Sequence, residues 1–152
     1  MAEDNPKSAA AAKIVRQNAL IAVSSVVVPI PFLGIPILGA VHLRMLRQLA
    51  KHYEVEFSEQ RANAIIGSLA GISATVAATG LLRMLPGIGP TLFAIGGLTL
   101  PSASTYALGE VFIKHFESGG TFLTFDPDRA KPDYDEKVAE RTTEESYAGI
   151  KP

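Results

Sequence analysis

The sequence predicts an all-α fold of two helical hairpins with Pro/Gly turns, inserted in a membrane and followed by a disordered acidic C-terminal tail. Three features lead to this expectation. Hydrophobic residues make up 47% of the 152 residues, the charged residues (19%) gather in a few places, and prolines and glycines interrupt the uncharged stretches. Uncharged apolar runs of about 18 residues or more are typical of membrane spans. We expect a flexible arm at 1–7, a hairpin domain at 8–122 and a mobile tail at 123–152.

The first hairpin is expected to turn at a group of prolines. Residues 8–20 have the composition of a helix that extends into the first apolar run, and Ser8 is a suitable N-cap for it. Residues 13–28 and 37–53 then form the two arms of the hairpin. Each proline removes an amide donor and clashes with the preceding turn, so one continuous helix across this stretch is excluded. The residues assigned to the turn are Pro29, Pro31, Gly34 and Pro36.

The second helix of this hairpin carries a basic face. Arg44, Arg47 and Lys51 recur at helical spacing opposite an apolar face, and Arg61 follows in the next charged segment. Two interpretations stay open: a solvated helix face, or a basic surface that rests on anionic lipid headgroups or on a partner. These four residues are the predicted membrane-surface or partner-binding positions.

The second hairpin is expected from two uncharged arms, residues 62–82 and 91–109. The turn between them is assigned to Pro86, Gly87, Gly89 and Pro90. Glycines four residues apart allow helices in a membrane to approach closely, and polar groups within an apolar helix tend to hydrogen-bond a neighbouring helix. The predicted helix-packing positions are Gly67, Gly71, Thr105, Tyr106 and Gly109.

The C-terminal part of the chain is predicted to be a mobile acidic tail. From Asp126 onward it contains prolines and acidic residues but few large aliphatic side chains. Such a segment buries too little apolar surface to offset the entropy of ordering.

Membrane insertion is preferred to a soluble helical bundle, which stays the alternative. A helix over residues 62–82 would be about 32 Å long at ~1.5 Å per residue, close to the ~30 Å of a hydrocarbon core. A soluble helix would carry charges along an outer face, and these arms carry almost none. The basic residues before and between the hairpins place the charged segments on the cytoplasmic side.

Three separated motifs, in the same order, resemble a known family of bacterial proteins. They are Ile30-Pro31-Phe32 with Ile35-Pro36; Arg83-Met84-Leu85-Pro86-Gly87-Ile88-Gly89; and Ala103-Ser104-Thr105-Tyr106-Ala107-Leu108-Gly109 with Phe116-Glu117-Ser118-Gly119-Gly120. Over residues 10–122 the chain is similar to the GTPase-associated domain-of-unknown-function family of the YcjF type. The resemblance implies a protein of the bacterial inner membrane that acts with a separate small GTPase and has no established enzyme activity. Many members carry an acidic residue where this sequence has Gly34.

The sequence also excludes several classes of chemistry. It has no cysteine, no Gly-x-x-x-x-Gly-Lys loop and no metal-ligand spacing among His42, His52 and His115. A net charge of −1 provides no field to attract nucleic acid. Glu110 and Lys114 have the spacing of an ordinary ion pair on one helix. We therefore predict no catalytic residue, no cofactor and no metal.

The expected function is that of a non-enzymatic, membrane-associated scaffold or adaptor. It would contact membrane lipid, self-associate into a homo-oligomer and act with a small GTPase in trans. An alternative of a different class is a soluble or shell-forming homo-oligomer whose apolar arms meet in subunit interfaces. A channel-like oligomer is disfavoured, because the arms offer no ring of charged residues to select ions.

Overall fold

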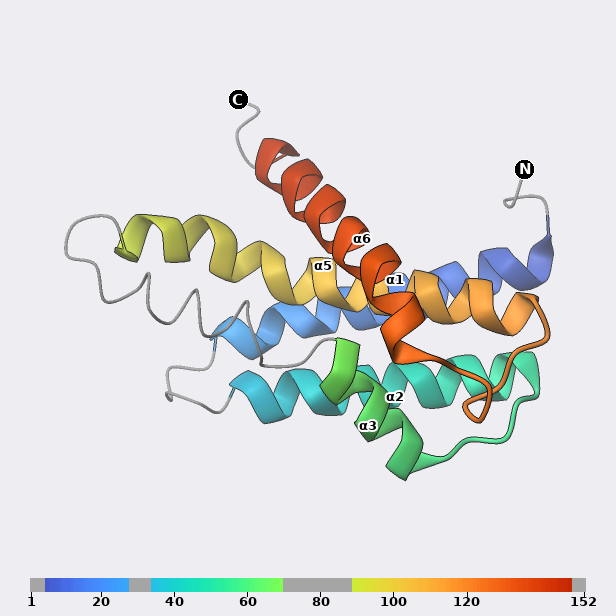
Figure 1. Cartoon of the computed structure of the whole chain (residues 1–152). Helices are drawn as coiled ribbons and strands as arrows, with labels where there is room; N and C mark the ends of the chain where they lie inside the picture. The colour runs from blue at the N-terminus through green and yellow to red at the C-terminus, as the bar shows by residue number, and fades with distance from the viewer. Residues whose placement is uncertain (1–4, 28–33, 70–88, 149–152) are drawn as a thin grey trace.

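The computed structural model describes residues 5–27, 34–69 and 89–148, and within these ranges every regular element is a helix (Figure 1). The described helices are α1 (Pro6–Val27), α2 (Gly34–Tyr53), α3 (Glu59–Leu69), α5 (Gly89–Glu117) and α6 (Pro127–Ala148). The predicted all-α class is confirmed over this part of the chain. In the same ranges no helix combines the length and the apolarity needed to cross a membrane. Residues 70–82 of the expected arm 62–82 lie outside the described residues.

The first hairpin is formed by α1 and α2, which pack side by side in opposite directions (Figure 1). Near the end of α2, His52 Nε2 lies 2.7 Å from the carbonyl oxygen of Lys7, near the start of α1. Further along the pair, the side-chain amide of Asn18 donates a hydrogen bond of 2.7 Å to Gln48 Oε1. Both contacts require the antiparallel arrangement.

The start of α1 differs from the predicted one. The cap is Asn5, whose Oδ1 accepts the amide of Lys7 at 3.0 Å, and Ser8 lies inside the helix. Pro6 takes the first helical position, where a missing amide costs nothing and the fixed φ angle suits the helix.

Helix α5 packs against both helices of the hairpin. It runs parallel to α2, because two hydrogen bonds between them join residues at almost the same sequence offset. His42 meets Thr105, 63 residues on, and Tyr53 meets Glu117, 64 residues on. Relative to α1 it runs in the opposite direction (Figure 1).

The core fills the space between α1, α2, α3 and α5, and α6 closes it from one side. Its largest buried apolar side chains are Val15, Met45, Leu46, Leu49, Leu69, Leu108 and Phe112. The loop after α5 adds aromatic rings: Phe125 stacks on Phe112 with centroids 4.6 Å apart, and Phe122 also packs against Phe112. These rings tie the loop to the C-terminal half of α5.

The residues assigned to the two turns are distributed differently from the prediction. Gly34 and Pro36 belong to the first turn of α2, and Gly89 and Pro90 are the first two residues of α5. Proline is well tolerated in a first helical turn, so it opens a helix here instead of forming the turn before it. Pro29, Pro31, Gly71, Pro86 and Gly87 lie outside the described residues.

The predicted mobile tail is wrong for most of its length. Residues Pro127–Ala148 form the 22-residue helix α6, which packs against α5 and α3. Asp126 caps it, since its Oδ1 accepts the amides of Asp128 and Arg129. Tyr134 is 4% exposed, and basic residues of α6 pair with an acidic residue of α5. These contacts supply the stabilisation that the composition of the segment does not indicate.

Candidate functional site

The basic face predicted on α2 is present on the surface. Arg44, Arg47 and Lys51 are all exposed, whereas Met45 and Leu46 on the other side of the helix are buried. Positions i, i+3 and i+7 fall within about 60° of one another around a helix and span about 10 Å along it. The three cations therefore form one row, which we call the basic row.

One member of the basic row is partly neutralised by α3. Arg47 forms an ion pair of 3.0 Å with Glu59, in the first turn of α3, and both side chains are about 60% exposed. The Arg47 guanidinium also lies 5.0 Å from the centre of the Phe57 ring. Arg61 is exposed two residues further on. Arg61 thus extends the basic surface from the basic row onto the start of α3, and the carboxylate of Glu59 lies within this surface.

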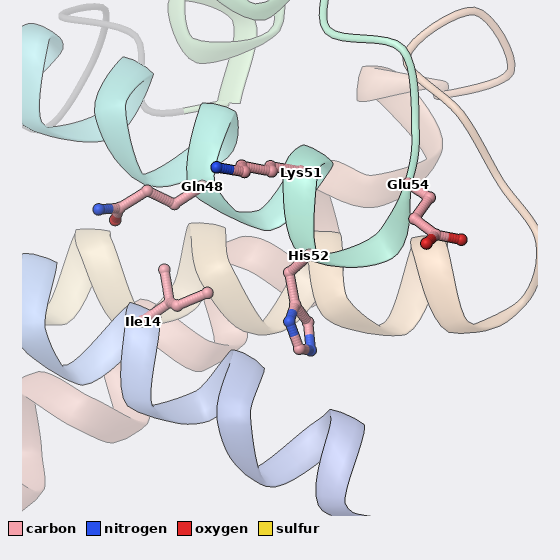
Figure 2. A pocket seen from close by; sticks show the side chains of 5 residues that line it. All are labelled: Ile14, Gln48, Lys51, His52 and Glu54. Carbon is pink, nitrogen blue, oxygen red and sulfur yellow. The ribbon is translucent and has the colours of Figure 1, made fainter.

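A shallow groove of about 460 Å³ lies beside the basic row, between α1 and the end of α2 (Figure 2). It is lined by Ile14, Gln48, Lys51, His52 and Glu54. The ammonium group of Lys51 and the carboxylate of Glu54 point away from each other, and His52 bonds the backbone of α1 (Figure 2). These groups do not converge on one point, so the groove has the geometry of a surface recess.

Thr105, a predicted helix-packing residue, makes a buried hydrogen bond to α2. It donates to the carbonyl of Pro101 at 2.7 Å and therefore accepts from His42 Nε2–H at 3.1 Å. Both side chains are at most 1% exposed. Burial lowers the pKa of His42 from 6.5 to about 4, so the imidazole is neutral at pH 7.

Tyr106 lies at the boundary between α5 and α6. Its ring is half-buried, and the guanidinium of Arg141 lies 4.6 Å from the ring centre. At the far end of α5, burial and the hydrogen bond to Glu117 raise the pKa of Tyr53. The two tyrosines thus join neighbouring helices: Tyr53 joins α2 to α5, and Tyr106 joins α5 to α6.

The three predicted packing glycines have different surroundings. A Cβ at Gly109 would lie 2.4 Å from Cγ2 of Val15, so α1 and α5 approach each other closely there. Gly67 is exposed on α3, and a Cβ there would meet nothing within 4 Å. Gly71 lies outside the described residues. Of Gly67 and Gly109, therefore, Gly109 is the one where the helix packing leaves no room for a side chain.

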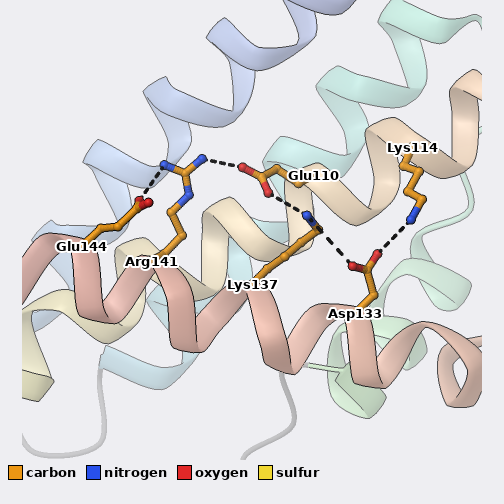
Figure 3. A network of polar contacts seen from close by, with 6 residues as sticks. All are labelled: Glu110, Lys114, Asp133, Lys137, Arg141 and Glu144. Carbon is orange, nitrogen blue, oxygen red and sulfur yellow. Dashed lines mark hydrogen bonds and ion pairs between the residues drawn. The ribbon is translucent and has the colours of Figure 1, made fainter. Parts of the chain in front are cut away.

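A second polar cluster, which the sequence analysis missed, joins α5 to α6 (Figure 3). Glu110 pairs with Lys137 at 3.2 Å and with Arg141, and Lys114 pairs with Asp133 at 3.5 Å. The i, i+4 spacing had predicted an ion pair of Glu110 with Lys114, but both side chains turn to α6. The i, i+4 spacing of Asp133 and Lys137, an acidic residue four positions before a basic one, is the signal that could have indicated a helix there.

No group of three or more acidic or histidine side chains in the described residues could hold a metal ion. The absence of a metal site, a cofactor site and a catalytic residue stays a prediction for the whole chain.

Comparison with known proteins places these features in a family. Residues 3–129 match the family described as a domain of unknown function, DUF697. A protein of Magnetospirillum gryphiswaldense, named magnetosome membrane protein 22, is 33% identical over 129 residues, which cover 82% of this chain. The aligned part spans 66% of that relative's length, slightly under two thirds. No solved structure matches the chain.

Proposed function

Because this chain belongs to the DUF697 family of domains of unknown function, we propose that it is a non-enzymatic scaffold or adaptor that binds a membrane surface. The observation that carries the proposal is the 33% identity to a protein named for the magnetosome membrane. The identity extends over 82% of this chain. The family description names no reaction, which is consistent with a structural role.

The basic row is the surface that we assign to lipid. Arg44, Arg47 and Lys51 project from one face of α2, and each basic residue near an anionic bilayer contributes about 1 kcal/mol. Glu59 offsets part of this attraction at Arg47. Membrane contact through such a surface requires no spanning helix. It fits a protein that lies on the cytoplasmic face of a bacterial inner membrane.

Vesicle flotation of the purified full-length chain tests the assignment. We expect binding to vesicles of phosphatidylcholine with phosphatidylglycerol, and a large loss when Arg44, Arg47 and Lys51 are all changed to Gln. The matched control changes three exposed cations of α1 to Gln: Lys7, Lys13 and Arg16. An equal loss in the control would show that only overall charge matters, and no binding by any variant would overturn the lipid assignment.

Fractionation of expressing cells shows how firmly the protein is held. Release by a carbonate wash is expected for a protein bound at the surface, whereas a requirement for detergent would indicate insertion. Recovery in the soluble fraction as a large monodisperse particle would support the alternative, a shell-forming homo-oligomer.

The small GTPase partner and self-association are the finer parts of the proposal. The exposed part of the basic row and the start of α3 offer a surface for a partner, and Gly67 offers an open helix face for a second copy. Pull-down with GTPases loaded with a GTP analogue or GDP tests the first, and light scattering tests the second. Equal recovery with an unrelated GTPase would count against a specific partner.

A further inference from the structure

Helix α6 is attached to the bundle by a different chemistry from the other helices. Half of its 22 residues are charged, and among its described side chains Tyr134 alone is buried. By contrast, α5 has no charged residue from Gly89 to Gly109. Burial of apolar surface stabilises the α1, α2 and α5 assembly, whereas the apolar contribution of α6 comes from Tyr134 in the core and from the partly buried Ala130 and Val138.

Apart from Tyr134 and its apolar neighbours, α6 is held by polar contacts that are partly open to water (Figure 3). The carboxylate of Glu110 forms ion pairs with both Lys137 and Arg141, and the exposed fractions of these three side chains are 25% to 37%. Ser102 donates to Glu145 at 2.9 Å, at the other end of the contact. Ion pairs of this kind contribute little each and are weakened by salt. The attachment of α6 is therefore weaker than the packing beneath it.

The face of α5 that α6 covers lies near the C-terminal end of the uncharged stretch, residues 89–109. Ser102 and Tyr106 are spaced four residues apart, on one face with Glu110, and Arg141 covers the Tyr106 ring. The match to the family ends at residue 129, so almost all of α6 lies beyond it. The covered face thus belongs to the family domain, and its cover does not.

We propose that α6 is a releasable cover: when the Glu110 ion pairs open, α6 leaves α5, and the uncovered face around Ser102 and Tyr106 contacts the lipid surface. This inference rests on the proposed membrane function. With seven acidic and four basic residues, α6 is repelled by anionic headgroups, so an anionic bilayer favours the released state. Tyrosine is a side chain that suits the level of the headgroups.

A crosslink between α5 and α6 tests the release directly. The chain has no cysteine, so Ser102→Cys with Glu145→Cys creates two thiols whose parent side chains are in contact. A short bis-maleimide joins them, and the same variant blocked with N-ethylmaleimide is the control. In vesicle flotation, the crosslinked protein is expected to lose most of the binding that the blocked control retains.

A second variant tests the ion pairs without a crosslink. Glu110→Gln removes both pairs, and we expect about tenfold tighter vesicle binding, because the fraction with α6 released limits the apparent affinity. Hydrogen exchange of the amides of residues 127–148 is expected to accelerate in parallel. The matched control is Asp135→Asn, which changes charge equally but breaks a pair internal to α6.

The outcomes separate this inference from the proposed function. If the crosslinked and blocked proteins bind equally, or if α6 exchanges only together with α1 and α2, the releasable cover is wrong and the membrane function stands. If no variant binds vesicles, both are wrong. Weaker binding by Glu110→Gln than by Asp135→Asn would also overturn the cover.

Discussion

The close approach of α1 and α5 at Gly109 makes a quantitative prediction about stability. A Cβ at Gly109 would lie 2.4 Å from Cγ2 and 2.6 Å from Cγ1 of Val15, well inside the ~3.5 Å of normal carbon contact. Val15 is 2% exposed, and a β-branched side chain in a helix has one preferred rotamer, so it cannot move aside. The two helices must separate instead.

The size of the effect follows from two opposing contributions. Overpacking of a buried contact costs about 1–3 kcal/mol, while Gly→Ala in a helix gains about 1 kcal/mol in propensity. We expect Gly109→Ala to lower the free energy of unfolding by about 0–2 kcal/mol, with a fall in Tm of about 2–4 °C for each kcal/mol lost. Gly67→Ala is the matched control. Its Cβ enters open space, so it should stabilise by about 0.5–1 kcal/mol.

Urea denaturation followed by circular dichroism measures both variants, and a double mutant identifies the cause. Val15→Ala removes the two methyl groups that the new Cβ would strike. The double variant Gly109→Ala with Val15→Ala should therefore be more stable than the sum of the single changes implies, by about 1–2 kcal/mol. Equal stability of the two Gly→Ala variants, or strict additivity in the double variant, would refute the close approach.

Three further predictions concern single side chains. Burial lowers the pKa of His42 to about 4. Between pH 6.5 and 4 the unfolded chain therefore binds a proton that the folded protein does not. The free energy of unfolding should fall as the pH drops through this window, by about 3 kcal/mol in total. Urea denaturation at several pH values should show His42→Gln losing this dependence, and an unchanged slope would contradict the burial of the neutral imidazole. Thr105→Val leaves His42 Nε2–H without its acceptor and should destabilise by about 1–3 kcal/mol, measured in the same way, whereas Thr105→Ser should be tolerated better. Glu54 directly follows α2 and has a φ of 59°, and the next residue, Val55, donates its amide to the Ala50 carbonyl. Glu54→Gly should therefore raise stability by about 0.5–1 kcal/mol in thermal melts, and a loss of stability would show that the Glu54 side chain matters more than its backbone conformation.

The helices of the first hairpin could be predicted because their signals are local. Three prolines excluded one continuous helix, and the alternation of apolar and basic residues identified the buried and exposed faces of α2. The basic row was predictable for the same reason, since Arg44, Arg47 and Lys51 follow helical spacing. The contact of Arg47 with Glu59 was not, because it depends on how residues 54–58 return α3 to the side of α2.

Helix α6 was missed because composition describes a segment without its partners. Residues 127–148 lack the aliphatic side chains that would indicate a helix packed on a core. Their stabilisation comes from Glu110 on α5, whose partners Lys137 and Arg141 are 27 and 31 residues away in sequence. Spacing within one helix predicted a local partner for Glu110, and only the three-dimensional arrangement shows that α6 offers two.

Buried polar residues fix the position of α5 along α2. Apolar contacts are non-directional and select the position of a helix less sharply than a hydrogen bond does. A slide by one turn, about 5.4 Å, would leave the buried Nε2–H of His42 without its acceptor, at a cost of about 1–3 kcal/mol, while Thr105 would keep only its bond to the Pro101 carbonyl on the same helix. The bond of Tyr53 to Glu117 would break in the same step, because both bonds have almost the same offset. The buried polar pair therefore selects one register for a helix whose apolar residues would stabilise several.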